Sequence, residues 1–145
     1  MRIALIVSRY HAFITDGLAQ GARDALVEAG VEPTAIETFA VPGAYELAQA
    51  ASRVAGTGRF DGMVCLGCLI RGETPHFDYI AQAAAHGILR AAQAHGIPAG
   101  FGLLTTNTAE EAMARSAPGE ANKGREAASA VIEMAQLYRG LGAGA

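Results

Sequence analysis

The fold of this chain is decided by the stretch MVCLGCLIRGETPHFDY, residues 63–79. Its first residues, Met63 to Leu66, form a short apolar run that predicts a buried strand, and the alanine-rich segment 80–94 predicts a helix. The residues between them predict a strand-to-helix loop, and in an open α/β sheet such loops lie at the carboxyl edge, where ligands bind. This loop has more polar side chains than a turn requires, namely Arg71, Glu73, Thr74, His76 and Asp78.

The rest of the chain repeats this alternation of strand and helix. Apolar runs predict strands at 3–7, 36–41, 62–66 and 99–104, and helical spacing predicts helices at 15–29, 44–54, 80–94, 109–115 and 122–138. We therefore expect a single α/β domain over residues 1–139, with a disordered tail over residues 140–145. The predicted architecture is a three-layer α/β/α sandwich of flavodoxin-like type with a four-stranded parallel sheet.

Composition and charge exclude several kinds of partner. The formal net charge of −3 gives no electrostatic reason to bind nucleic acid or an acidic membrane surface. The N-terminal apolar run is too short for a signal peptide or a membrane span, so we expect a cytoplasmic protein. Cys65 and Cys68 form a C-x-x-C pair on an extended run, which predicts buried, reduced thiols and no metal site. A hydrophobic content of 51% with few charges favours a homo-oligomer.

His76 is the best candidate for a catalytic residue. Its unperturbed pKa lies near neutrality, so it can both donate and accept a proton. Asp78 could orient its ring, and the alternative is a histidine that only caps the following helix. The loop before it, Arg71 to Thr74, could hold an anion on backbone amides, or Arg71 could form a structural ion pair.

Other candidates follow the remaining strands. Tyr10 and Phe101 could stack on a heteroaromatic ring or belong to the core. Glu46 lies in the first turn of a predicted helix, where a carboxylate is favourable with or without a ligand. A second basic cluster could bind phosphate or form a solvated face, and its members are Arg115, Lys123 and Arg125.

Five segments, in order and over nearly the whole chain, resemble the lumazine synthase family. They are ITD at 14–16, VPGAYE at 41–46, GCLIRGETPHFDY at 67–79, FGLLTT at 101–106 and NKGREAA at 122–128. The resemblance implies an enzyme of riboflavin biosynthesis. That family condenses 5-amino-6-(ribitylamino)pyrimidinedione with 3,4-dihydroxy-2-butanone 4-phosphate to 6,7-dimethyl-8-ribityllumazine, without a metal or redox cofactor.

The resemblance also implies roles for individual residues. His76 would transfer protons. The ring and ribityl chain of the substrate would contact Tyr10, Ala44, Tyr45, Glu46, Cys68, Leu69, Ile70 and Phe101. The phosphate would be held by the amides of Glu73 and Thr74 and by the side chains of Arg115 and Lys123. The site would lie between neighbouring subunits of a pentamer.

The sequence departs from the family pattern at several positions. Tyr10 replaces the usual phenylalanine, His11 the usual asparagine, and Cys68 a small residue such as alanine. These changes keep open an alternative function, a non-catalytic paralogue that binds flavin or lumazine. Residues 117–121 read APGEA where the family often has GTKAG, so a basic side chain is missing, and we expect a pentamer rather than a sixty-subunit shell. A flavodoxin-like signalling domain would need an acidic phospho-acceptor cluster, which the sequence lacks.

Overall fold

A computed structural model describes residues 1–142 of the chain. Its sheet has four parallel strands in the order β2-β1-β3-β4. The strands are β1 (Ile3–Ser8), β2 (Ile36–Val41), β3 (Gly62–Ile70) and β4 (Ala99–Thr106). Parallel strands need long crossovers, and the helices supply them, as the sequence pattern predicted.

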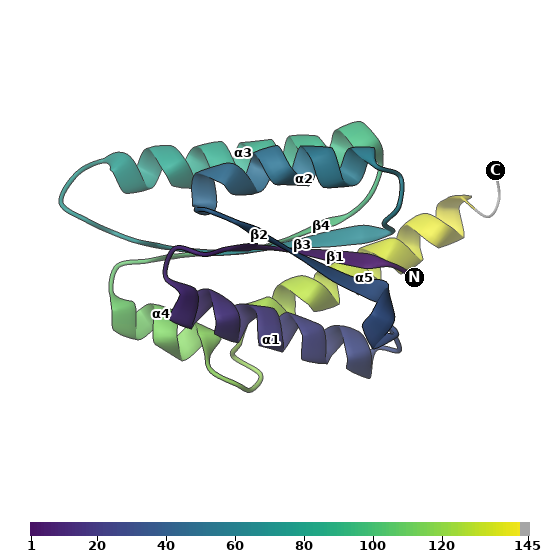
Figure 1. Ribbon diagram of the computed structural model, residues 1–145, viewed down its shortest axis with the longest axis horizontal. Helices are drawn as coiled ribbons and strands as arrows, with labels where there is room; N and C mark the ends of the chain where they lie inside the picture. The colour runs from purple at the N-terminus through teal and green to yellow at the C-terminus, as the bar shows by residue number, and fades with distance from the viewer. Residues whose placement is uncertain (143–145) are drawn as a thin grey trace.

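The helices cover both faces of this sheet (Figure 1). On one face lie α2 (Leu47–Gly56) and α3 (His76–His95), and on the other α1 (Ala12–Glu28), α4 (Ala109–Ser116) and α5 (Lys123–Gly142). Two short 3-10 helices, η1 (Pro33–Ala35) and η2 (Ala44–Glu46), precede β2 and α2. The predicted three-layer α/β/α sandwich is therefore confirmed.

The side chains of the central strands alternate between two hydrophobic cores. Ile3 and Leu5 pack on the side of α1 and α5, whereas Ala4 and Ile6 pack on the side of α2 and α3. A strand buried on both faces reads as a continuous apolar run, which is why the apolar pattern located β1 and the start of β3 correctly. The carboxyl ends of all four strands point toward the left end of the molecule in Figure 1.

The strand β3 is longer than predicted. It continues from Leu66 to Ile70, because Gly67 to Ile70 pair with Leu103 to Thr106 of β4. The helix α3 also begins earlier than predicted, at His76 instead of Ile80, with Pro75 at its N-cap. The polar loop is thus only residues 71–75, and His76 belongs to the first turn of a helix.

One end of each of two further helices differs from the prediction. The helix α1 begins at Ala12, not near Thr15, because the carbonyl of His11 accepts hydrogen bonds from the amides of Ile14 and Thr15. His11 has φ 63°, which is uncommon outside glycine. The helix α5 runs to Gly142, so the tail expected from residue 140 is wrong for residues 140–142, and residues 143–145 lie outside the described part.

The buried side chain of Asn122 joins the start of α5 to α1. Asn122 is 1% exposed, and its side-chain amide donates to the carbonyls of Gly17, Ser116 and Ala117. Its Oδ1 accepts from the amide of Arg125 and so caps α5. The motif NKGREAA at 122–128 therefore has a structural role at the start of α5.

The helix α4 begins with a modified capping box. The Thr108 side chain accepts a hydrogen bond from the Glu111 amide at 3.2 Å. In return, the Glu111 carboxylate accepts from the amide of Asn107 at 3.1 Å, one residue earlier than in the standard box.

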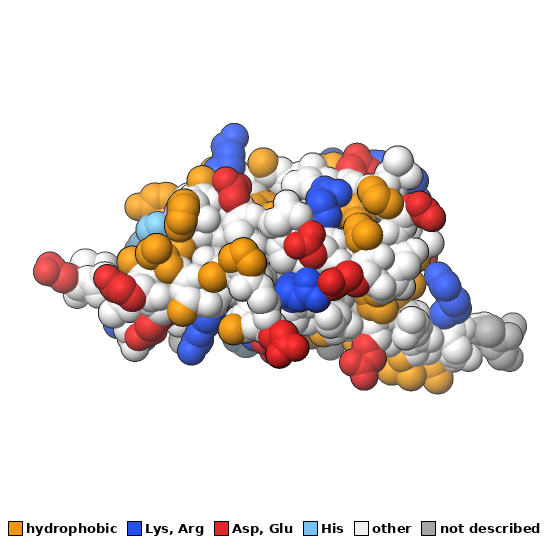
Figure 2. All heavy atoms as spheres, turned by 90° about the horizontal axis from the view of Figure 1, so that it is seen from below, with side chains coloured by type: hydrophobic (Ala, Val, Ile, Leu, Met, Phe, Trp, Pro, Cys, Tyr) orange, Lys and Arg blue, Asp and Glu red, His pale blue; other side chains and the backbone are white. Residues whose placement is uncertain are grey.

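Charges of both signs are mixed on the face formed by α1, α4 and α5 (Figure 2). Hydrophobic side chains and a histidine gather at the left end in that view, the end that carries the carboxyl edge of the sheet. Over residues 1–142, no helix is both long and apolar enough to cross a membrane.

Candidate active site

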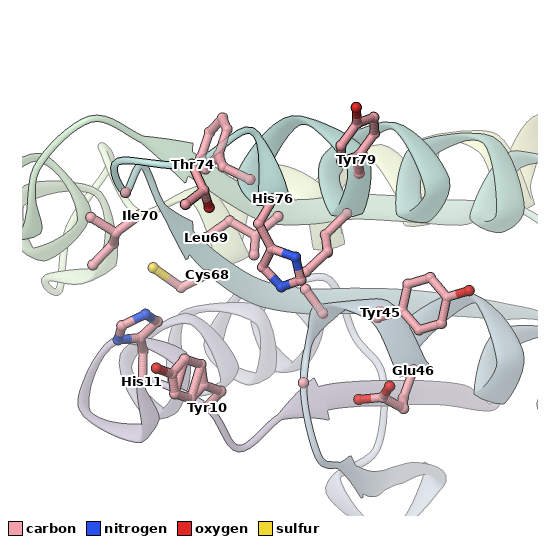
Figure 3. A pocket seen from close by; sticks show the side chains of 15 residues that line it. Tyr10, His11, Tyr45, Glu46, Cys68, Leu69, Ile70, Thr74, His76 and Tyr79 are labelled. Carbon is pink, nitrogen blue, oxygen red and sulfur yellow. The ribbon is translucent and has the colours of Figure 1, made fainter.

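A cavity of about 860 Å³ opens at the carboxyl edge of the sheet. Its walls come from the end of β1, the start of η2, the end of β3 and the first turns of α3 (Figure 3). This is where ligands bind in open α/β folds. The predicted site residues that line it are Tyr10, Ala44, Tyr45, Glu46, Cys68, Leu69, Ile70, Thr74 and His76.

The His76 ring projects from the start of α3 into this cavity (Figure 3). Within residues 1–142 it forms no hydrogen bond and no ion pair with a side chain. The ring is exposed and therefore available to a ligand. An unpaired imidazole at a cavity wall suits proton transfer better than a structural role.

Asp78 does not orient His76 as we had considered. Its carboxylate instead lies 3.5 Å from the guanidinium of Arg71. Arg71 also donates from Nε to Asn107 Oδ1 at 3.1 Å and stacks on the Phe77 ring, 4.5 Å from the centroid. The structural alternative for Arg71, an ion pair, is thus confirmed.

Two aromatic rings form the wall opposite α3. Tyr10 and His11 have their ring centroids 4.5 Å apart at an angle of 42°. Both rings line the cavity. Tyr10 is 66% exposed, so its ring face is free for a planar ligand, and it does not belong to the core.

The remaining wall of the cavity consists of buried small residues and of polar groups. Ala44 and Cys68 are buried, and Glu46 is half-buried with its carboxylate drawn beside the cavity in Figure 3. Of the proposed phosphate-binding pair in the loop, only Thr74 lines the cavity within the described residues, together with Gly72. Glu73 is exposed and does not line the cavity, as expected if it contributes its backbone amide and not its carboxylate.

Burial raises the pKa of both thiols. The Cys65 pKa rises from 9.0 to about 12, and the Cys68 pKa rises from 9.0 to about 11. Both cysteines are buried and free, as predicted from the sequence. Cys68 is therefore a neutral, poorly nucleophilic group in the cavity wall at neutral pH.

This shift predicts that the protein loses stability above about pH 9. There the unfolded chain releases thiol protons that the folded chain keeps, so the free energy of unfolding falls by up to about 1.4 kcal/mol per pH unit for each thiol. Urea unfolding of the wild type and of the double variant Cys65→Ala/Cys68→Ala at pH 8 and pH 10 measures this effect. Equal losses in the two proteins between these pH values would contradict it.

A second, smaller hollow of about 370 Å³ lies elsewhere on the chain. Its lining includes the predicted site residues Phe101, Arg115 and Lys123, and Phe101 is 40% exposed. Lys123 lies 3.2 Å from the Glu126 carboxylate, whereas within residues 1–142 no carboxylate forms an ion pair with Arg115. Arg125, the third member of the expected basic cluster, pairs instead with Glu28.

A single chain thus divides the predicted site residues between two hollows. Sequence reasoning gave no site role to several lining residues of the larger cavity, namely Gly43, Phe77, Tyr79 and Ile80. The last three belong to the first turns of α3, and the sequence pattern placed the start of that helix too late to include Phe77 and Tyr79. Among the described residues, no three His, Cys, Asp or Glu side chains are close enough to hold a metal ion.

Comparison with known proteins gives a consistent result. The sequence profile of the 6,7-dimethyl-8-ribityllumazine synthase family matches residues 1–139. The chain is 47% identical over 140 residues to the 6,7-dimethyl-8-ribityllumazine synthase of Nautilia profundicola, covering 97% of this chain and 91% of the relative. It is 44% identical over 142 residues to that of Helicobacter hepaticus, covering 98% and 91%. It is 47% identical over 138 residues to 6,7-dimethyl-8-ribityllumazine synthase 1 of Caulobacter vibrioides, covering 95% and 90%.

Proposed function

The chain belongs to the 6,7-dimethyl-8-ribityllumazine synthase family, and on that premise we propose how its two hollows share the reaction. The protein is a transferase of riboflavin biosynthesis. It condenses 5-amino-6-(ribitylamino)pyrimidinedione with 3,4-dihydroxy-2-butanone 4-phosphate to give 6,7-dimethyl-8-ribityllumazine. This chemistry needs an oriented amine and ketone, an anion site for the leaving phosphate and a proton-transfer group near neutrality.

The larger cavity holds the pyrimidinedione in this proposal. Its ring lies against Tyr10, and the ribityl hydroxyls donate to the Glu46 carboxylate. The walls are formed by Ala44, Tyr45 and the strand end from Cys68 to Ile70. The exposed ring of Tyr10 and the buried apolar strand end support this placement, because a flat heterocycle gains from both stacking and burial.

The phosphate-bearing substrate lies between the 71–75 loop and a basic surface. The amides of Glu73 and Thr74 precede α3, where unpaired N–H groups and the helix dipole favour an anion. His76 then transfers protons during imine formation, loss of phosphate and ring closure. The single observation that carries this assignment is the unpaired His76 ring facing the cavity beside Thr74.

The second hollow completes the site of a neighbouring subunit. Phe101 would cover the other face of the ring, and Arg115 and Lys123 would bind the phosphate. Support comes from their position in a hollow of their own and from the large exposed apolar side chains of one chain, such as Phe13, Tyr79 and Leu89. We propose a pentamer, in which each of five contacts builds one site.

We also propose that the enzyme works in the cytoplasm without a metal or redox cofactor. The two free thiols support a reducing compartment. The condensation itself transfers no electrons between the substrates and an external acceptor.

The proposed function predicts catalysis of lumazine formation well above the spontaneous rate. The purified protein is incubated with both substrates, and the absorbance and fluorescence of the lumazine are followed. Turnover no faster than the spontaneous reaction, combined with tight binding of riboflavin in a calorimetric titration, would instead support the non-catalytic paralogue that Tyr10, His11 and Cys68 left open. Light scattering of the same sample tests the pentamer, and a monomer mass would refute it.

A further inference from the structure

The side chain of Arg71 joins three segments at the edge of the cavity. The backbone amide of Arg71 donates to the carbonyl of Thr106 at the end of β4 at 2.9 Å. Its Nε donates to Asn107 Oδ1, and its guanidinium contacts both Asp78 and the ring of Phe77 in the first turn of α3. One residue thus connects the ends of β3 and β4 to the start of α3.

The loop that Arg71 begins has little other support. Over residues 1–142, no hydrogen bond of the backbone or side chains involves Gly72, Glu73 or Thr74. Its far end is held by the amides of Asp78 and Tyr79, which both donate to the Pro75 carbonyl. Arg71 is therefore the side chain that bridges the two ends of the loop.

Arginine is suited to this bridge because its planar guanidinium can donate hydrogen bonds along its edge while its face stacks on an aromatic ring. The edge bonds Asn107 and approaches Asp78, and the face covers Phe77. An ion pair between two half-exposed side chains contributes little alone, so the combination with stacking is what restricts the guanidinium.

From these contacts we propose that Arg71 is a positioning residue for the reaction. It fixes the 71–75 loop and the first turn of α3, so that the Thr74 amide and the His76 ring meet the phosphate-bearing substrate in one geometry. Ile70 and Gly72 on either side of it line the cavity, together with Phe77, on which it stacks. The inference rests on the proposed function for the roles of Thr74 and His76.

The chain offers a matched control in Arg59. Its guanidinium stacks on Phe60, 4.9 Å from the ring centroid, and pairs with Glu37. The side chains of Arg59 and Arg71 are 50% and 48% exposed. Arg59 precedes β3, so it makes the same kinds of contact at the opposite end of the sheet from the cavity.

Arg71→Ala is expected to lower kcat about tenfold and to raise the KM of the phosphate-bearing substrate severalfold. The KM of the pyrimidinedione should change less than twofold, because Tyr10 and Glu46 are held by other segments. Arg59→Ala should leave all three parameters unchanged, with a melting temperature lowered as much as in Arg71→Ala. Arg71→Lys should recover only a minor part of the lost rate, and Asn107→Ala should reproduce part of the loss.

Equal kinetics for Arg71→Ala and Arg59→Ala would overturn the proposal, as would a loss that Arg71→Lys fully restores. A second readout does not depend on turnover. In NMR spectra without substrate, the Thr74 amide and the His76 ring resonances should shift or broaden in Arg71→Ala and stay in place in Arg59→Ala. If the wild type made no lumazine, the proposed function would fail, whereas unchanged resonances in Arg71→Ala would refute the positioning role itself.

Discussion

Gly124→Ala is expected to lower the free energy of unfolding by about 3 kcal/mol or more. A Cβ at this position would lie 2.0 Å from the carbonyl oxygen of Leu18 and 3.0 Å from Asn122 Oδ1. The oxygen of Leu18 belongs to the backbone of α1, so it cannot turn away as a flexible side chain would. The helices must separate, which also weakens the buried bonds of Asn122.

Gly140→Ala is the matched control on the same helix. A Cβ there meets nothing within 4 Å, and alanine has the higher helix propensity, so stability should stay within about 1 kcal/mol of the wild type or rise slightly. Urea unfolding followed by circular dichroism compares the two variants. A similar stability for both would mean that the contact of α1 and α5 is far more adaptable than the structure indicates.

His76→Ala is expected to slow lumazine formation by on the order of ten- to a hundredfold without abolishing it. The ring faces the cavity and, within the described residues, makes no hydrogen bond, so its removal should cost little stability. The remaining rate comes from holding both substrates in place, which does not need an imidazole. Steady-state kinetics with both substrates, and a melting curve, measure the two effects.

His86→Ala is the control, because His86 is exposed on the same helix and does not line the cavity in the part of the chain described. It should retain the wild-type rate. If His76→Ala kept the full rate as well, another group would have to transfer the protons. If it lost both rate and fold, the residue would be structural, in conflict with its exposed position.

Mixing two slow variants tests whether neighbouring chains share the site. In the shared site that we propose, His76→Ala and Arg115→Ala each damage one half, so co-assembled rings should contain roughly a quarter of intact sites and regain activity accordingly. Sites built within one chain would gain nothing from co-assembly. The two residues line different hollows of one chain, which is why a regain is expected.

The sequence was most informative where burial is uniform. Apolar runs located β1 and the start of β3 closely, and the strand-loop alternation placed Tyr10, Glu46 and His76 at one edge of the sheet. The sequence pattern was wrong where strands meet loops. The residues from Gly67 to Ile70 pair with β4 through backbone groups, which every residue has whatever its side chain. No local sequence pattern predicts such backbone pairing.

Long-range contacts account for the other misses. The Arg71 side chain is fixed by Asn107, a residue 36 positions away, and Asn122 bonds Gly17 across 105 positions. Such partners follow from the packing of whole elements. The start of α1 was missed for a local reason instead. His11 has a left-handed backbone conformation, and its carbonyl, not a side-chain cap, accepts the first hydrogen bonds of the helix.

The length of β3 limits how this enzyme can evolve a new selectivity. Cys68, Leu69 and Ile70 form a wall of the cavity and are also rungs of the ladder with β4. Inserting or deleting one residue there would turn every following side chain to the opposite face of the sheet. Adaptation to a different heterocycle must therefore proceed by exchanging single side chains on a fixed backbone, such as Cys68 in the cavity wall.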